Sequence, residues 1–400
     1  MNQVETRLAM DNGTPVRNTP LPYGHQQIDE DDIRMVTDVL RSDWLTTGPK
    51  VAEFEEAFSQ ITGARQAVAV SNGTAALHTA MHAAGIGPGD QVIVPAMTFA
   101  ATANCVVFQG GTPVFADVSP HTLLIDPDQV VHKITPRTRA IIAVDYAGQP
   151  CDYEALRTIA GRHGLVLVAD ACHSLGATYR GRPVGTLADL NTFSFHPVKH
   201  ITTGEGGMVT TGDPVMAERM RRFRNHGIGS DQNKRNEQGT WYYEMTALGY
   251  NYRMTDFQCA LGISQLRKLG AWVAARQEIA RHYHHALADI EGVAPLGEHG
   301  DVTHAYHLYV VRLDSSRFKA GREVMFKALR AEGIGVNVHY IPVHLHPFYR
   351  SRFGTTRGMC PAAEEAYEEI LSLPIFPGMS IQDREDVIRA LRKVVSGLRR

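Results

Sequence analysis

Short runs of β-branched and other apolar residues recur along the chain at 67–70, 91–94, 113–118, 140–146 and 165–170. The stretches between them have the length and apolar spacing of helices, and two of these close at a glycine, as helices often do. An alternation of strand and helix patterns is typical of a mainly parallel sheet covered by helices. The first part of the chain is therefore predicted to be an α/β domain.

A smaller block with a different pattern follows. Residues 255–289 read as largely helical, and we interpret them as a connector that leaves the sheet domain. After it come a strand-like run at 306–313, a helix-like run at 323–333, a further apolar run at 335–340 and a final helix from about Gln382. This block is predicted to be α+β.

These patterns divide the 400 residues into three parts. We expect a flexible N-terminal tail over residues 1–20, a large domain over 21–265 and a small C-terminal α+β domain over 266–400. A chain of this length can bury a sizeable core.

Charge and cysteine content exclude several classes of function. The chain has 40 Lys and Arg against 42 Asp and Glu, so no overall field attracts nucleic acid or a membrane surface. No apolar run is long enough to span a bilayer, and the N-terminus lacks a signal pattern. Five scattered cysteines favour reduced thiols. We expect a cytoplasmic protein with no nucleic-acid or membrane partner.

Two glycine-rich motifs would indicate a nucleotide-binding site, and the sequence contains neither. The sequence GIGPGD at 85–90 follows a helix and precedes a strand, which is the reverse of the dinucleotide fingerprint, so it reads as a turn. No phosphate-binding loop of the G-x-x-x-x-G-K-[ST] type occurs. The chain is therefore not predicted to be a Rossmann dehydrogenase or a P-loop NTPase.

Two strand ends carry polar residues that suit a ligand. The strand at 67–70 runs into Ser71-Asn72-Gly73-Thr74 and then a helix, whose N-terminus would attract a phosphate unless Ser71 or Thr74 only caps it. The strand at 165–170 delivers Asp170 to the edge where open α/β sheets bind ligands. His173, three residues on, is either a core histidine or part of such a site.

A third strand end leads to a lysine. The alternation of Thr192 and Ser194 with Phe193 and Phe195 predicts a strand, and Lys199 follows it before a Thr-Thr-Gly turn. A lysine, a carboxylate and a phosphate cradle together are what pyridoxal 5′-phosphate requires. The lysine would have to be buried, because burial lowers its pKa and leaves an amine able to attack a carbonyl.

At these residues the chain resembles the DegT/StrS sugar-nucleotide aminotransferases, pyridoxal-phosphate enzymes of fold type I. The resemblance runs from about Tyr23 to the C-terminus and rests on six ordered motifs: LTTGPKVAEFEEAF, SNGTAALHTA, PAMTFAATANC, VADACHSLGA, FSFHPVKHITTGEGGMV and LGYNYRMTDFQCALGISQL. PYGHQQIDEDD and RSDWLTTGP resemble the branch that aminates UDP-4-keto-6-deoxy-N-acetylhexosamines on the way to pseudaminic acid.

The resemblance implies roles for individual residues. Lys199 would form the Schiff base with the cofactor, and Asp170 would pair with its pyridine nitrogen. Phe99 would stack on the ring, and His173 would face its phenolic oxygen. The 3-dehydrases of the family have histidine in place of the lysine, so Lys199 disfavours dehydration.

The resemblance also implies a shared site. Gly73, Thr74 and Ser194 would hold the phosphate, and Asn251 would reach the phosphate of the neighbouring subunit of a homodimer. The residues that it places around the substrate are Tyr23, Asp43, Trp44, Leu45, Thr46, Gly73, Ser194 and Tyr340.

The C-terminal histidines allow two interpretations, a metal site or part of the substrate cleft. His339, His344 and His346 could be spaced for a metal, but no carboxylate or cysteine completes a ligand set, and we predict no metal site. The segment reads better as a lip of the substrate cleft, with Tyr340 on sugar or uracil.

The predicted activity is a ping-pong transamination from an amino acid, L-glutamate as we expect, to C4 of a UDP-linked keto sugar. The alternatives are an aminotransferase for another nucleotide sugar, 3-keto or dTDP-linked, a regulator that binds pyridoxal phosphate without turnover, and a pyridoxal-phosphate lyase or decarboxylase.

Overall fold

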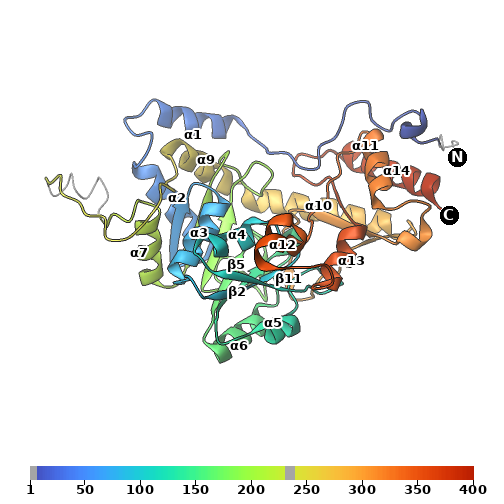
Figure 1. The fold of residues 1–400 in the computed structure, drawn as a ribbon. Helices are drawn as coiled ribbons and strands as arrows, with labels where there is room; N and C mark the ends of the chain where they lie inside the picture. Colours follow the sequence, from blue (N-terminus) through green and yellow to red (C-terminus); the bar gives the residue numbers. More distant parts are fainter. Residues whose placement is uncertain (1–6, 230–238) are drawn as a thin grey trace.

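The computed structural model describes residues 7–229 and 239–400. Its centre is a seven-stranded sheet in the order β1-β9-β8-β5-β4-β2-β3 (Figure 1). The strands are β1 (Gln66–Val70), β2 (Gln91–Pro95), β3 (Thr112–Ala116), β4 (Thr138–Val144), β5 (Val166–Asp170), β8 (Leu190–Ser194) and β9 (Gly207–Thr211). Only β9 runs antiparallel to its neighbours. The predicted α/β class with a mainly parallel sheet is confirmed.

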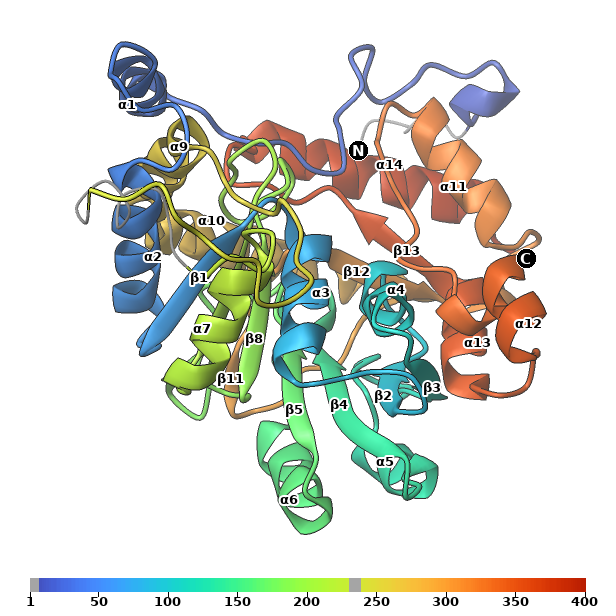
Figure 2. The ribbon, with the colours of Figure 1, turned by 60° about the vertical axis from the view of Figure 1, so that its left-hand side comes forward.

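Helices cover the sheet because both of its faces are apolar. The helix α3 (Gly73–Ala83) packs against the sheet and against α4 (Ala101–Phe108) and α7 (Pro214–Phe223), as Figure 2 shows. The other helices of this part are α1 (Glu30–Leu40), α2 (Pro49–Thr62), α5 (Pro127–Lys133) and α6 (Tyr153–His163). Strand residues such as Val68, Ile93 and Ile141 are fully buried in this core.

Two helices lead out of the sheet part, as the pattern over 255–289 predicts. They are α9 (Asp256–Leu266) and α10 (Leu269–Leu287). The helix α9 begins at a capping box, in which Thr255 accepts from the backbone of Gln258 and Gln258 accepts from the backbone of Thr255. The domain boundary expected near residue 265 falls at the end of α9 and stays a prediction.

The C-terminal part is built on a second sheet of β10 (Val293–Pro295), β12 (Tyr309–Leu313) and β13 (Ile370–Leu373). It also contains α11 (Arg322–Ala331), α12 (Pro347–Phe353), α13 (Pro361–Glu369) and α14 (Ile381–Leu398). The run at 335–340, expected as an apolar element, forms only an isolated bridge between Asn337 and Ser372. A small third sheet joins β11 (Val302–Thr303) to β6 (Thr178–Tyr179) and β7 (Arg182–Pro183).

The flexible N-terminal tail that we expect over residues 1–20 stays a prediction. Its described part, from residue 7, is anchored by the fully buried carboxylate of Glu332, which accepts hydrogen bonds from the backbone of Ala9 and Val16. The ammonium of Lys393 pairs with the same carboxylate at 2.9 Å. From this anchor the chain crosses to α1 at the opposite end of the molecule (Figure 1). A local sequence pattern cannot reveal an anchor that lies more than 300 residues away.

No helix among residues 7–229 and 239–400 is both long and apolar enough to cross a membrane.

Candidate active site

Three strands end side by side and carry the predicted residues. The strands β5 and β8 are parallel, with Asp170 opposite Thr192, and β1 points the same way because β9 lies antiparallel between it and β8. The carboxyl ends of β1, β5 and β8 therefore share one edge of the sheet. Ligands bind at this edge in open α/β sheets.

The N-terminus of α3 forms the first side of the site. Asn72 caps this helix by accepting a hydrogen bond of 2.8 Å from the backbone of Ala75, so the cap is neither Ser71 nor Thr74. A Cβ at residue 73 would lie 2.7 Å from the Cβ of Ser194, so only glycine fits at this position. Gly73 and Ser194 are thus in direct contact, next to the backbone N–H groups at the start of the helix. This pairing suits a phosphate.

A carboxylate held by a threonine forms the second side. Asp170 is 6% exposed, and its Oδ2 accepts a hydrogen bond of 2.7 Å from the hydroxyl of Thr102 on α4. Because the Thr102 hydroxyl has one proton, it must accept from Thr98, whose hydroxyl lies 2.8 Å away. Thr102 is not among the residues predicted from the sequence, although the i, i+4 pair of threonines in the motif PAMTFAATANC could have indicated it.

The amine of Lys199 forms the third side. Its Nζ lies 3.3 Å from Nε2 of His307, a residue that the sequence did not single out. Burial lowers the pKa of Lys199, and the Asp170 carboxylate opposes part of this effect. Burial and the nearby Lys199 amine together lower the pKa of His307 well below its ordinary value, so this imidazole is neutral.

A line of rings connects Lys199 to the surface. The ring of His307 lies 4.3 Å from that of His173, and Nε2 of His173 lies 3.2 Å from the hydroxyl of Tyr340. The Tyr340 ring lies 5.9 Å from Phe99, which is 60% exposed. Burial is the main reason why the pKa of His173 is well below its ordinary value. These four rings form one wall of the site.

The predicted substrate residues lie in different parts of the structure. Tyr23 reaches the site, since its ring lies 5.4 Å from His339 and the next residue, Gly24, would carry a Cβ 3.4 Å from Val198. The run from Asp43 to Thr46 is bonded to the start of α9 through the bridge between Thr46 and Thr255 and the hydrogen bond from the backbone of Asp256 to Leu45.

Trp44 and Leu45 are 41% and 49% exposed. Asn251 is also exposed, and its backbone pairs with Asn225. Within the described residues, no hydrogen bond, ion pair or ring contact joins Asn251 or the run 43–46 to Lys199.

The C-terminal histidines have separate partners. Nδ1 of His339 lies 2.8 Å from the hydroxyl of Ser372, whereas Nε2 of His344 pairs with the Glu364 carboxylate at 2.8 Å. In the part of the chain that the structure describes, no three His, Cys, Asp or Glu side chains are grouped as they would be around a metal.

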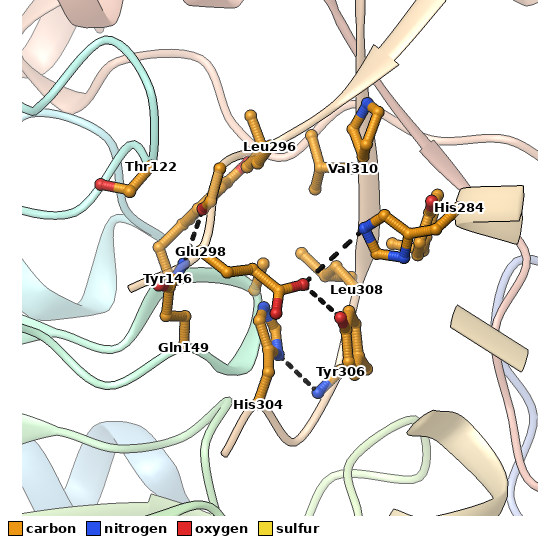
Figure 3. Close-up of a pocket in the computed structure, with 14 residues that line it drawn as sticks. Thr122, Tyr146, Gln149, His284, Leu296, Glu298, His304, Tyr306, Leu308 and Val310 are labelled. Atoms are coloured by element: carbon orange, nitrogen blue, oxygen red, sulfur yellow. Dashed lines mark hydrogen bonds and ion pairs between the residues drawn. The ribbon is translucent and has the colours of Figure 1, made fainter. Parts of the chain in front are cut away.

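A small pocket lies on the other side of residues 304–308 and is shown in Figure 3. Its lining includes Gln149, His284, Glu298, His304 and Tyr306, and Glu298 accepts a hydrogen bond from Tyr306. Lys199, Asp170 and Ser194 do not line it. It is separate from the candidate active site.

The residues at the sheet edge fit pyridoxal phosphate. Lys199 provides a half-buried amine of lowered pKa, and Asp170 provides a buried carboxylate. Gly73 provides bare backbone at the N-terminus of α3. The buried Nδ1 of His173 has no hydrogen-bond partner among the described residues, so a polar group of a ligand would satisfy it.

Comparison with known proteins agrees with this site. The model of the DegT/DnrJ/EryC1/StrS aminotransferase family matches residues 26–392. The chain is 44% identical over 383 residues to the spore coat polysaccharide biosynthesis protein SpsC of Bacillus subtilis, covering 95% of this chain and 98% of SpsC.

Two solved structures are similar throughout. The putative sugar aminotransferase Spr1654 from Streptococcus pneumoniae, in its PMP form, has a TM-score of 0.89 at 32% identity, covering 94% of this chain and 99% of that one. PseC of Helicobacter pylori, an aminotransferase involved in pseudoaminic acid biosynthesis, has a TM-score of 0.88 at 30% identity, covering 94% and 99%. Spr1654 has also been solved in a PLP form.

A family match over most of the chain, together with the structural neighbours, shows a sugar aminotransferase with the fold of pyridoxal-phosphate enzymes. The chain belongs to the DegT/DnrJ/EryC1/StrS aminotransferase family and depends on pyridoxal phosphate.

Proposed function

We propose that this aminotransferase moves an amino group from L-glutamate to C4 of a UDP-4-keto-6-deoxy-N-acetylhexosamine. The observation that carries the proposal is the half-buried Lys199 amine, of lowered pKa, at the same sheet edge as Asp170 and the Gly73–Ser194 pair. Such an edge provides a nucleophile, a charge for the cofactor ring and an anchor for phosphate.

Each residue has a task in this proposal. Pyridoxal phosphate, when bound, supplies an aldehyde carbon and a ring that accepts electrons. Asp170 holds a proton on the ring nitrogen, and Thr102 keeps the carboxylate in place through its hydrogen bond. Gly73, Thr74 and Ser194 hold the phosphate, His173 faces the phenolic oxygen, and Phe99 covers the ring.

Lys199 then acts as the acid and base. With pyridoxal phosphate bound, the free and neutral Nζ of Lys199 would be able to take a proton from Cα of the donor and return a proton to the aldehyde carbon of the cofactor. The lowered pKa of Lys199 favours the neutral amine that this transfer needs. The second half-reaction uses the same proton transfers in reverse to leave the amino group on the sugar.

The choice of substrate is supported by similarity and by two segments. PseC shares the fold at 30% identity, and SpsC, at 44%, is named for polysaccharide biosynthesis. Tyr23 and Tyr340 lie on the rim beside His339 and His173, respectively. We propose that they contact the nucleotide sugar.

We also propose a homodimer with shared sites. An exposed apolar group precedes Asn251: Trp241, Tyr242, Tyr243, Met245 and Leu248 are 55–85% exposed in the single chain. Monomers rarely expose so much contiguous apolar surface. A second copy would cover it and would bring its Asn251 and its residues 43–46 to the first copy's site. Our expectation that the enzyme acts in the cytoplasm rests on its five free thiols.

A substrate panel tests the proposal. The enzyme is incubated with glutamate and, separately, UDP-4-keto-6-deoxy, dTDP-4-keto-6-deoxy and 3-keto sugars, and products are identified by mass spectrometry. An amine on the UDP-4-keto sugar alone supports the proposal, whereas an amine only on another sugar assigns that substrate instead. If glutamate leaves the absorbance of the bound cofactor unchanged, another donor is used or the protein is a regulator, which a screen of amino acids separates.

A further inference from the structure

The segment 304–308, between β11 and β12, lies beside the active site and is hydrogen-bonded to several other parts of the chain. The backbones of Ala305 and Leu308 donate hydrogen bonds to Gly148 and Ala147, respectively. His200 lies with its Nε2 3.1 Å from the carbonyl of Ala305, and the buried guanidinium of Arg276 donates to the carbonyls of residues 306 and 307. The position of this segment is therefore fixed by several distant elements.

A glycine permits its close approach. Gly148 has a φ of +109°, and a Cβ there would lie 2.8–2.9 Å from the carbonyl of His173 and from the backbone nitrogens of Tyr306 and His307. A side chain at residue 148 would push the segment away. Gly148 thus lets His307 lie within 4.3 Å, ring to ring, of His173.

The donor and the acceptor in the hydrogen bond between His307 and Lys199 follow from the surroundings of the imidazole. His307 is 5% exposed, and its buried Nδ1 has no hydrogen-bond partner in the part of the chain that the structure describes. A buried N–H without an acceptor is more costly than a buried lone pair without a donor. The proton therefore belongs on Nε2, which donates to the lone pair of the Lys199 amine 3.3 Å away.

We propose that His307 is a positioning residue for Lys199: its Nε2–H holds the free amine of this lysine at one place in the site. A lysine side chain has four rotatable bonds and many accessible conformations. When the cofactor is not covalently bound to Lys199, no covalent bond fixes the position of the amine in the site. The hydrogen bond from His307 keeps that amine oriented for its next reaction. This inference rests on the role proposed for Lys199.

A pair of amide variants tests this role. In His307→Gln the amide nitrogen takes the place of Nε2 and keeps a donor within reach of Lys199, whereas in His307→Asn the shorter side chain does not reach. The cofactor is removed, and the rate at which each apoprotein captures pyridoxal phosphate covalently is followed by absorbance. Affinity for pyridoxamine phosphate, which has no aldehyde, is measured in parallel as the control for an intact cofactor site.

We expect His307→Asn to slow covalent capture at least tenfold with its affinity for pyridoxamine phosphate within threefold of the parent, and His307→Gln to restore most of the rate. Capture by His307→Asn within twofold of the parent overturns the inference. So does a loss that Gln does not restore, or that pyridoxamine phosphate binding shares, because either result indicates a structural role.

The Lys199→Ala apoprotein separates this inference from the proposed function. If Lys199→Ala captures no pyridoxal phosphate while His307→Asn captures it normally, only the role of His307 is wrong. If Lys199→Ala still captures the cofactor covalently, the proposed role of Lys199 is wrong, and the role of His307 with it.

Discussion

The hydroxyl of Thr102 donates a 2.7 Å hydrogen bond to Oδ2 of Asp170, joining the first turn of α4 to the end of β5. The donor is buried and is itself held by Thr98. The hydrogen bond fixes the position of the Asp170 carboxylate, which the proposed cofactor ring would face.

Thr102→Val should remove this hydrogen bond with little change in shape. A lost hydrogen bond to a buried charge costs about 1.5–3 kcal/mol, so we expect the rate of the glutamate half-reaction to fall roughly 10- to 100-fold. Stopped-flow absorbance measures it. Thr102→Ser, which keeps the hydroxyl, is the matched control and should stay within a few-fold of the parent. Equal rates for Val and Ser would show that the hydrogen bond has no role.

Asp170→Asn should have a larger effect than Thr102→Val. The amide preserves the size of the side chain but cannot provide the charge that keeps the ring nitrogen protonated. We expect much of the cofactor to be retained and the rate to fall by several powers of ten. A loss below about tenfold, roughly 1.4 kcal/mol, would assign this task to another group.

Lys199→Ala should abolish turnover and leave the fold intact. Lys199 is the proposed nucleophile and proton carrier, and its Nζ contacts only His307 among the hydrogen bonds of the described residues. Circular dichroism and the melting temperature provide the control for folding. Near-normal kcat in folded Lys199→Ala protein, without added amine, contradicts the assignment.

Mixed dimers test whether Asn251 acts across the subunit interface. Lys199→Ala and Asn251→Ala proteins, each strongly impaired, are unfolded and refolded together. If Asn251 acts in trans, one site of each mixed dimer combines an intact Lys199 with an intact Asn251, and activity returns. If it acts in cis, every site keeps one defect. An unchanged rate in verified mixed dimers would rule out the shared site.

Glu332→Ala should destabilise the C-terminal part and release the N-terminal segment. The change leaves the buried ammonium of Lys393 with the Thr14 carbonyl but without a countercharge, and leaves two backbone donors unpaired; breaking such a buried ion pair costs about 3–5 kcal/mol. Glu323→Ala is the control, because its pair with Lys327 is exposed and adds little to stability. Urea unfolding measures both. Equal stability of the two variants would show that Glu332 is no anchor.

Much of this protein was readable from local pattern. Strand and helix periods predicted the α/β sheet, because burial on both faces requires continuous apolar runs such as those of β4 and β5. The strand ends likewise pointed to Asp170, Ser194 and Lys199, since parallel strands place their carboxyl ends at one edge. The family motifs then suggested roles for them.

Only the tertiary structure decided the contacts between distant segments. Thr102 lies 68 residues from Asp170, and His307 lies 108 residues from Lys199. The sequence raised only Ser71 and Thr74 as possible caps of α3, whereas the cap is Asn72; all three have capping side chains, and only backbone geometry selects among them. The buried Glu332 also accepts a hydrogen bond from the backbone of Val16, a contact that no local pattern predicts. Sequence periodicity reports which face of an element is buried, whereas the chain's path in three dimensions decides which buried polar groups meet.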